Sequence, residues 1–243
     1  MAKYFIIVGA LISGGLLAMY FWIGVPTIYE EDFVSGTPHR LGDPNRSISH
    51  IQIRAFYFVP QDRQNDLLIQ WPAVLEEHLK ELQEFHALQF QNKSALAYRI
   101  YPEAVIGDEP GLFYDTEVTQ HGNPEALRRI VAELERRFPE IRQGEGTSVE
   151  KGVYDVIVIL YEGVGASGGD NAALLSRTFF SDPQYKDVAS TLLTHEFYHT
   201  LGIPDGYEPE TAIPTTFDIM GLGRSRSLLR AYFDRKTLKE MGI

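Results

Sequence analysis

The chain has 243 residues, of which 44% are hydrophobic and 23% charged, a composition typical of a folded protein rather than a disordered, collagen-like or disulfide-rich one. The formal net charge of −11 disfavours nucleic acid and anionic lipid as main partners, because phosphate contacts need clustered Lys and Arg. The sequence has no cysteine, which excludes disulfides, Cys-ligated zinc and thiol nucleophiles.

The first 26 residues predict a membrane anchor. Residues 4–25 carry no charged side chain, and a helix of that length extends about 33 Å, enough to cross a hydrocarbon core of about 30 Å. Lys3 precedes this span and Glu30 is the next charged residue after it, which favours a single-pass protein with a cytoplasmic N-terminus and an extracytoplasmic remainder. The alternative is a signal peptide that is cleaved to release a secreted protein, although no Ala-x-Ala-like site follows the span.

Small residues recur within this span at intervals of four. Ala10, Gly14 and Ala18 would line one face of a transmembrane helix, and small side chains let two helices pack closely. One interpretation is weak dimerisation through the anchor, and the other is that small residues are simply common in membrane helices.

Residues 27–50 follow no helical or strand period. They contain proline, glycine, serine and scattered charges, which predicts a linker or an N-terminal arm of the folded part. Within this segment, Gly42 and Asp43 faintly resemble the inhibitory aspartate of astacin pro-segments. That resemblance leaves open whether the arm keeps the protein latent.

Residues 51–243 alternate between strand and helix patterns. Stretches rich in β-branched and aromatic residues, or nearly continuously apolar, predict strands at 51–59, 95–101, 153–161 and 172–180. Apolar residues at three- and four-residue steps, or a cap followed by proline, predict helices at 71–85, 123–138, 185–201 and 228–241. This order predicts an α+β fold class, α/β-like, in which helices pack against a mixed sheet.

One group of residues on the third predicted helix has the types and spacing that can bind a metal ion. His195 and His199 stand four residues apart and project from one face of a helix, so both imidazoles can reach one zinc ion. Glu196 lies between them and can accept a proton from zinc-bound water without ligating the metal. Gly202 can end the helix in the left-handed conformation, after which Asp205 can offer its carboxylate as a third ligand. The alternative is a capped amphipathic helix without metal, whose polar groups would then need other partners.

The pattern resembles the active site of metzincin metallopeptidases. The resemblance covers the motif from His195 to Asp205 and the later sequence Asp-Ile-Met-Gly that contains Met220. In that clan a helix carries two ligands, a glycine turn leads to the third, and a methionine turn passes beneath one catalytic zinc ion. The usual third ligand is His, and Asp in its place is similar to snapalysin and the immune inhibitor A peptidases. The resemblance implies a zincin catalytic domain over residues 51–243.

Two features of the resemblance concern substrate binding. Astacin- and serralysin-type members carry a tyrosine two residues after the turn methionine, where this chain has Leu222, so another group must stabilise the oxyanion. Tyr207 is the candidate, and its alternative role is packing over the loop. The resemblance also implies that an edge strand aligns the substrate, and it assigns this role to 172–180, preceded by a loop at 163–171.

The sequence therefore predicts a membrane-anchored zinc endopeptidase that acts on peptides or proteins. Glu196 is the expected general base, and His195, His199 and Asp205 are the expected ligands of one Zn²⁺. One alternative is a zinc-containing, membrane-tethered binding protein without proteolytic activity. Another is a structural anchor protein without a metal site. The sequence gives no prediction of substrate or cleavage specificity.

Overall fold

The computed structural model describes residues 36–115, 122–142, 152–208 and 211–243. The predicted anchor at 1–26, including Ala10, Gly14 and Ala18, lies outside these residues. Within the described ranges, no helix has both the length and the apolar character that crossing a membrane requires.

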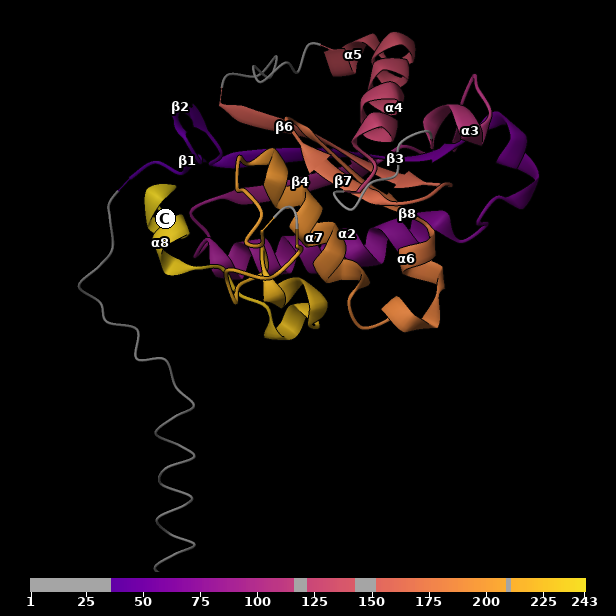
Figure 1. The fold of residues 1–243 in the computed structure, drawn as a ribbon. Coiled ribbons are helices and arrows are strands. Elements are labelled where there is room, and N and C mark those ends of the chain that lie inside the picture. Colours follow the sequence, from indigo (N-terminus) through magenta and orange to yellow (C-terminus); the bar gives the residue numbers. More distant parts are fainter. Residues whose placement is uncertain (1–35, 116–121, 143–151, 209–210) are drawn as a thin grey trace, which may run out of the picture. The chain divides into compact units, whose positions relative to one another are not determined.

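Seven α-helices and a mixed sheet make up most of the described part, with short 3-10 turns (η) between them (Figure 1). The elements are β1 (His39–Arg40), β2 (Asp43–Ser47), β3 (His50–Val59), η2 (Gln61–Asp66), α2 (Trp71–Gln89), β4 (Ala95–Ile100), β5 (Val105–Ile106), α3 (Gly111–Tyr114), α4 (Pro124–Arg137), α5 (Pro139–Arg142), β6 (Val153–Tyr161), β7 (Ala166–Gly169), β8 (Ala172–Ser176), α6 (Thr178–Ser181), η3 (Pro183–Tyr185), α7 (Ala189–Thr200), η4 (Leu222–Ser225), η5 (Leu228–Arg230) and α8 (Arg235–Glu240).

The main sheet is mixed and mostly parallel. Its strand order is β4-β3-β6-β8-β7, and β5 pairs with the end of β3. The strands β4, β3, β6 and β8 run parallel, whereas β7 pairs antiparallel with β8 and forms an edge. Parallel neighbours require long crossovers, which α2 provides between β3 and β4. The predicted mixed sheet with packed helices is therefore confirmed at the level of architecture.

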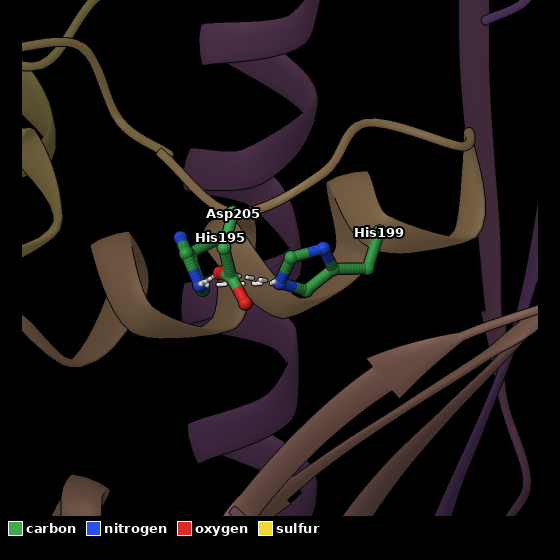
Figure 2. Close-up of side chains that lie close together, drawn as sticks. All are labelled: His195, His199 and Asp205. Carbon is green, nitrogen blue, oxygen red and sulfur yellow. Dashed lines mark hydrogen bonds and ion pairs between the residues drawn. The ribbon is translucent and has the colours of Figure 1, made fainter. Parts of the chain in front are cut away.

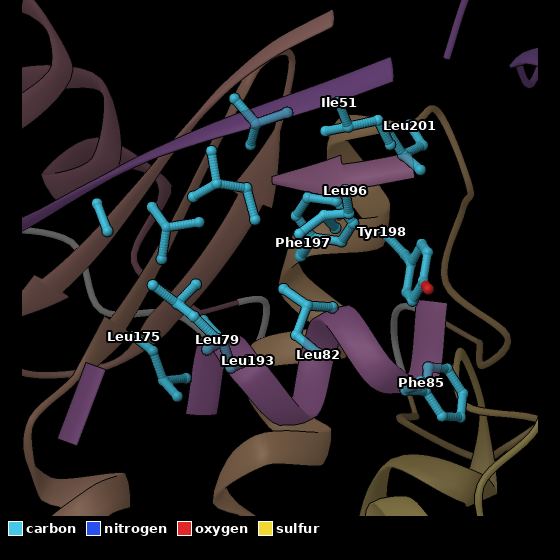
Figure 3. Close-up of a cluster of buried hydrophobic side chains, with 14 of the residues drawn as sticks. Ile51, Leu79, Leu82, Phe85, Leu96, Leu175, Leu193, Phe197, Tyr198 and Leu201 are labelled. Carbon is cyan, nitrogen blue, oxygen red and sulfur yellow. The ribbon is translucent and has the colours of Figure 1, made fainter. Parts of the chain in front are cut away.

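Helices cover both faces of this sheet. On one face, alternate residues of β3 and β6 pack against α2, α7 and the C-terminal segment in one apolar cluster, part of which Figure 3 shows. On the other face, the intervening residues of the same strands pack against α3, α4 and α5. Because both of its faces are buried, β6 is nearly continuously apolar, as the sequence indicated, and β3 is apolar over its second half.

The predicted strand at 172–180 is too long and is not the edge strand. β8 ends at Ser176, and the next residues form the short helix α6. β8 lies between β6 and β7, and β7 falls inside the segment predicted as a loop, 163–171. Glycines suggested a loop, but here they permit close packing: a Cβ atom on Gly168 would lie 2.0 Å from the carbonyl oxygen of Glu196.

The predicted helix at 228–241 is also interrupted. Residues 228–230 form η5, the chain is then extended, and α8 begins after Asp234. The Asp234 carboxylate accepts hydrogen bonds from the backbone N–H groups of Lys236 and Thr237 at 3.0 and 3.2 Å, so a new helix cap starts there. The helix predicted at 185–201 begins later, at Ala189, because residues 183–185 form a separate 3-10 turn.

Residues 36–50, which the sequence placed in a linker or arm, pack onto the folded body. The His39 N–H donates to the carbonyl of Met241, and the Leu41 N–H donates to the carbonyl of Leu201, each at 3.0 Å. The Asp43 carboxylate accepts a hydrogen bond from the Asn45 N–H at 3.2 Å, within β2. The arm is therefore attached both to the end of α7 and to the C-terminal segment.

Candidate metal centre

The orientation of the two histidines on α7 is set by the apolar side of the helix, which packs in the core. Leu193, Phe197 and Tyr198 are completely or almost completely buried in the cluster beneath the sheet. His195 and His199 lie one turn apart on another side, where His195 is 2% exposed and His199 half-buried. The apolar positions of α7 therefore fix the direction in which both imidazoles point.

Gly202 turns the chain back toward these histidines. Its φ of +83° lies in the left-handed region, and its N–H donates to the carbonyl of His199 at 3.0 Å. A Cβ atom at this position would lie 2.7 Å from the carbonyl oxygen of Leu41, so only glycine fits. The turn places Asp205 opposite the two imidazoles (Figure 2).

Three side chains converge on one point. The Nε2 atoms of His195 and His199 are 3.2 Å apart, and each lies 3.2 Å from Oδ1 of Asp205. Tetrahedral ligands at 2.0–2.1 Å from a zinc ion are separated from one another by about 3.3–3.4 Å. The triangle of donor atoms therefore has almost the size of one face of a zinc coordination tetrahedron. In the described part of the chain, no other group of three His, Asp or Glu residues shows such convergence.

Backbone carbonyls orient both imidazole rings. His195 Nδ1 lies 3.1 Å from the carbonyl oxygen of Ile219, and His199 Nδ1 lies 2.8 Å from that of Ile203. A carbonyl oxygen only accepts, so each Nδ1 carries a proton and each ring turns its Nε2 atom toward Asp205. Such carbonyl contacts are the usual outer support of metal-binding histidines.

The donor set fits a metal cation. Two imidazole lone pairs and a carboxylate face one another, and three acceptors without a shared proton repel unless a cation lies among them. Burial raises the pKa of Asp205, but its contacts with His195 and His199 outweigh burial and hold that pKa well below its usual range. Burial likewise opposes protonation of His199, whereas Asp205 and the charge of Glu196 raise its pKa. Two nitrogens and one carboxylate oxygen, with a fourth position left for water, suit catalytic zinc.

Glu196 follows His195 directly and so lies on an adjacent face of α7. Its side chain is half-buried, and burial raises the pKa of its carboxyl, while the nearby imidazoles of His195 and His199 oppose that rise. A general base works best when its pKa is close to the operating pH, so a raised carboxyl pKa suits proton transfer. The residue is therefore placed beside the three donor atoms without being one of them.

The turn at residues 218–221 supports the centre from below. Met220 is 2% exposed within the apolar cluster, and its carbonyl accepts a hydrogen bond from the Gly206 N–H at 2.8 Å. The preceding residue, Ile219, supplies the carbonyl that holds His195. The buried Asp218 carboxylate accepts from the Thr216 hydroxyl at 2.6 Å and so fixes the turn. One turn thus positions both a histidine and the segment that carries Asp205.

Tyr207, the candidate for stabilising the oxyanion, lies beside the centre. Its hydroxyl is beside the Asp205 carboxylate, and burial together with this carboxylate raises the pKa of the phenol to about 12. Its ring is nearly parallel to that of His195, with centroids 6.3 Å apart. Arg224 lies over the same ring, with its guanidinium carbon 4.0 Å from the centroid. Sequence reasoning missed Arg224, because an arginine four residues after a turn methionine carries no local signal.

The edge strand β7 runs against α7. The carbonyl of Gly165 accepts from the Ser176 N–H, toward β8, and the carbonyl of Ala166 accepts from the Asn123 N–H, on the opposite side, each at 2.9 Å. Backbone groups alternate along a strand, so the N–H and C=O of Gly168 also point away from β8. The main chain of Gly168 lies against the backbone of Glu196 in α7.

No protein-family model and no curated protein sequence matches the chain. Among solved structures, it is similar to metalloproteinase-II from Bacteroides fragilis, with a TM-score of 0.46 and 14% identity over 87% of this chain and 58% of that one. It is also similar to a catalytically inactive OgpA from Akkermansia muciniphila in complex with an O-glycopeptide substrate, with a TM-score of 0.44 and 14% identity over 88% of this chain and 63% of that one. The chain thus spans about three fifths of the length of each.

Proposed function

We propose that the chain is a zinc-dependent endopeptidase. The observation that carries the proposal is the triangle of His195 Nε2, His199 Nε2 and Asp205 Oδ1, with sides of 3.2 Å, beside a half-buried glutamate. Its dimensions suit zinc, and its open side suits a water molecule and a substrate carbonyl. The resemblance of the motif and of the turn around Met220 to metzincin peptidases supports the same reaction.

The chain's own residues have separate tasks in peptide-bond hydrolysis. Zinc, when bound by His195, His199 and Asp205, lowers the pKa of a water molecule and polarises the scissile carbonyl. Glu196 takes the proton from the attacking water and delivers it to the leaving amine nitrogen. The main chain of Gly168 pairs with the extended substrate and holds its carbonyl near Glu196.

We also propose that residues 1–26 anchor the protein in a membrane, with residues 51–243 as the extracytoplasmic catalytic domain. The uncharged stretch at 4–25 supports the anchor, and the charges on either side of it support this orientation. Substrates would then be peptides or proteins at the cell surface or in the envelope. A secreted protein released by signal cleavage is the competing outcome, which N-terminal sequencing of the mature protein distinguishes.

The deciding experiment measures zinc and cleavage in the full-length chain, purified in mild detergent. We expect about one zinc per chain in the parent and little in His199→Ala. We also expect the parent to cleave a mixture of internally quenched peptides, with the activity lost on chelation and restored by zinc. Bound zinc without cleavage would favour a binding protein, and a metal-replete parent without zinc would refute the site.

A further inference from the structure

Arg224 lies beside the candidate centre. It lies on η4, four residues after Met220, and its side chain is half-buried. Its guanidinium stacks on the ring of Tyr207, whose hydroxyl lies beside the ligand Asp205. Among the residues that the structure describes, no carboxylate forms an ion pair with it. A half-buried cation without a carboxylate is unusual in a chain with a net charge of −11 and suggests an external anion.

Two contacts fix the position of this cation. The turn that carries Arg224 is closed by hydrogen bonds from the Gly223 N–H to the carbonyl of Asp218 at 2.8 Å and from the Arg224 N–H to that of Gly221 at 3.3 Å. Tyr207, on which the guanidinium rests, follows Asp205 by two residues. The same turn therefore holds His195 through Ile219 and holds Arg224 beside the loop that carries Asp205.

Stacked rings place Arg224 close to the ligands. Its guanidinium carbon lies 4.0 Å from the centroid of the Tyr207 ring, and that ring lies nearly parallel to the ring of His195, with centroids 6.3 Å apart. Tyr207 itself is a poor hydrogen-bond donor for substrate, because its hydroxyl lies beside the Asp205 carboxylate. Leu222, at the position where some metzincins have a tyrosine, offers no polar group.

We infer that Arg224 binds the oxygen of the scissile carbonyl as that oxygen becomes negative, and that Tyr207 positions the guanidinium for this contact. This inference rests on the proposed function. A fixed donor aimed at a developing oxyanion, in a partly desolvated site, is the arrangement that stabilises a transition state most. Arginine is suited to the task because it stays charged and its planar group stacks on an aromatic ring.

The electrons and protons of the step balance without any further reactant. The oxygen of water forms a bond to the carbonyl carbon, its proton moves to Glu196, and the π electrons of the carbonyl move onto the oxygen that Arg224 contacts. When the carbon–nitrogen bond breaks, that electron pair re-forms the carbonyl. The proton held by Glu196 passes to the amine nitrogen, and the peptide leaves as an acid and an amine.

The test compares Arg224→Met and Arg224→Lys with the parent and with Arg230→Met, which removes an exposed arginine six residues further along the chain and so matches the charge change. Zinc content and the thermal midpoint are measured first. Steady-state kinetics on internally quenched peptides and calorimetric binding of a phosphinic peptide, an analogue of the tetrahedral transition state, follow. Calorimetry gives a readout that does not depend on turnover.

We expect Arg224→Met to keep zinc and to lower kcat about 100-fold or more with KM nearly unchanged, because one oxyanion donor contributes about that factor. The affinity for the phosphinic peptide should fall by the same factor as kcat/KM. Arg224→Lys, which keeps the charge but not the planar group, should lose about 10-fold, and Arg230→Met less than 2-fold.

Other results overturn the inference in distinguishable ways. If Arg224→Met raises only KM, and only for peptides with an acidic side chain or a free carboxyl terminus, Arg224 binds a substrate carboxylate instead. If Arg224→Met loses zinc or unfolds, Arg224→Lys becomes the deciding variant. If Arg224→Lys then binds the phosphinic peptide as tightly as the parent does, the guanidinium does not have the role assigned to it. If the parent holds zinc and cleaves peptides while Arg224→Met does so equally well, only this inference fails. If the parent neither holds zinc nor cleaves, the proposed function fails with it.

Discussion

His86 should make the stability of the protein depend on pH in a specific way. The ring is completely buried between α2 and α7, with Nδ1 3.2 Å from the Tyr198 hydroxyl and Nε2 2.8 Å from the Ser94 hydroxyl. Ser94 donates its own proton to the carbonyl of Ile48, so it accepts from Nε2–H, and Nδ1 is left to accept from Tyr198. The neutral ring thus satisfies every partner, and burial lowers the pKa of His86 to about 3.

The sign and size of the effect follow from this lowered pKa. The unfolded chain binds a proton at His86 near pH 6.5 and the folded chain does not, so stability falls as the pH drops below about 6.5 and stops falling only near pH 3. Between pH 7 and pH 5 the loss of unfolding free energy is about 2 kcal/mol. For a folded body of this size, that is a fall in Tm of about 4–8 °C.

The assay is urea unfolding of the full chain at pH 7, 6 and 5, for the parent and for His86→Gln. Glutamine keeps a donor and an acceptor but does not titrate in this range. Both proteins carry the same candidate metal ligands, so subtraction removes the contribution of those ligands. We expect the difference in unfolding free energy between the two proteins to shrink by about 2 kcal/mol from pH 7 to pH 5. Parallel pH profiles would refute the assignment of a buried neutral imidazole.

The remaining predictions concern the centre itself. Glu196→Gln should keep about one zinc and lose about 10²–10⁴ in kcat, and full activity would remove Glu196 from the role of general base. Asp205→Ala should weaken zinc retention, as measured by competition with a chelator, and an unchanged affinity would place the third ligand elsewhere. Gly168→Ala should lower cleavage and weaken zinc retention, because its Cβ would lie 2.0 Å from the Glu196 carbonyl oxygen and would displace the helix that carries both histidines; normal kinetics and zinc content would show that β7 and α7 are not packed this closely.

Features of the fold and site that depend on residues close together in the sequence could be predicted from the sequence. Two histidines four apart must share a face once a helix forms, and Gly202 must turn the chain where no side chain fits. The apolar run of β6 predicted a central strand, because a strand covered on both faces has no polar side.

Features that depend on contacts between residues far apart in the sequence could not be predicted. β7 forms from glycine-rich residues because α7 leaves room for a backbone but not for a side chain, and glycine by itself signals only a turn. Arg224 is brought to Tyr207 by the fold of a loop rather than by spacing along the chain. Backbone carbonyls orient both imidazoles, and every residue has one. The sequence therefore could not indicate that the carbonyls of Ile203 and Ile219 have this role.

The attachment of the N-terminal arm has a consequence for the time at which the site forms during synthesis. The Leu41 N–H donates a hydrogen bond to the carbonyl of Leu201 at the end of α7, and the carbonyl of Ile219 orients the imidazole of His195. The arm is in turn fastened to Met241. In a chain that emerges N-terminus first, His195 is synthesised before Ile219, and the arm is synthesised before Met241, so these contacts of the described geometry form only after the three ligands have emerged. The three donor atoms are therefore brought together only after segments on both sides of α7 in the sequence have folded onto it.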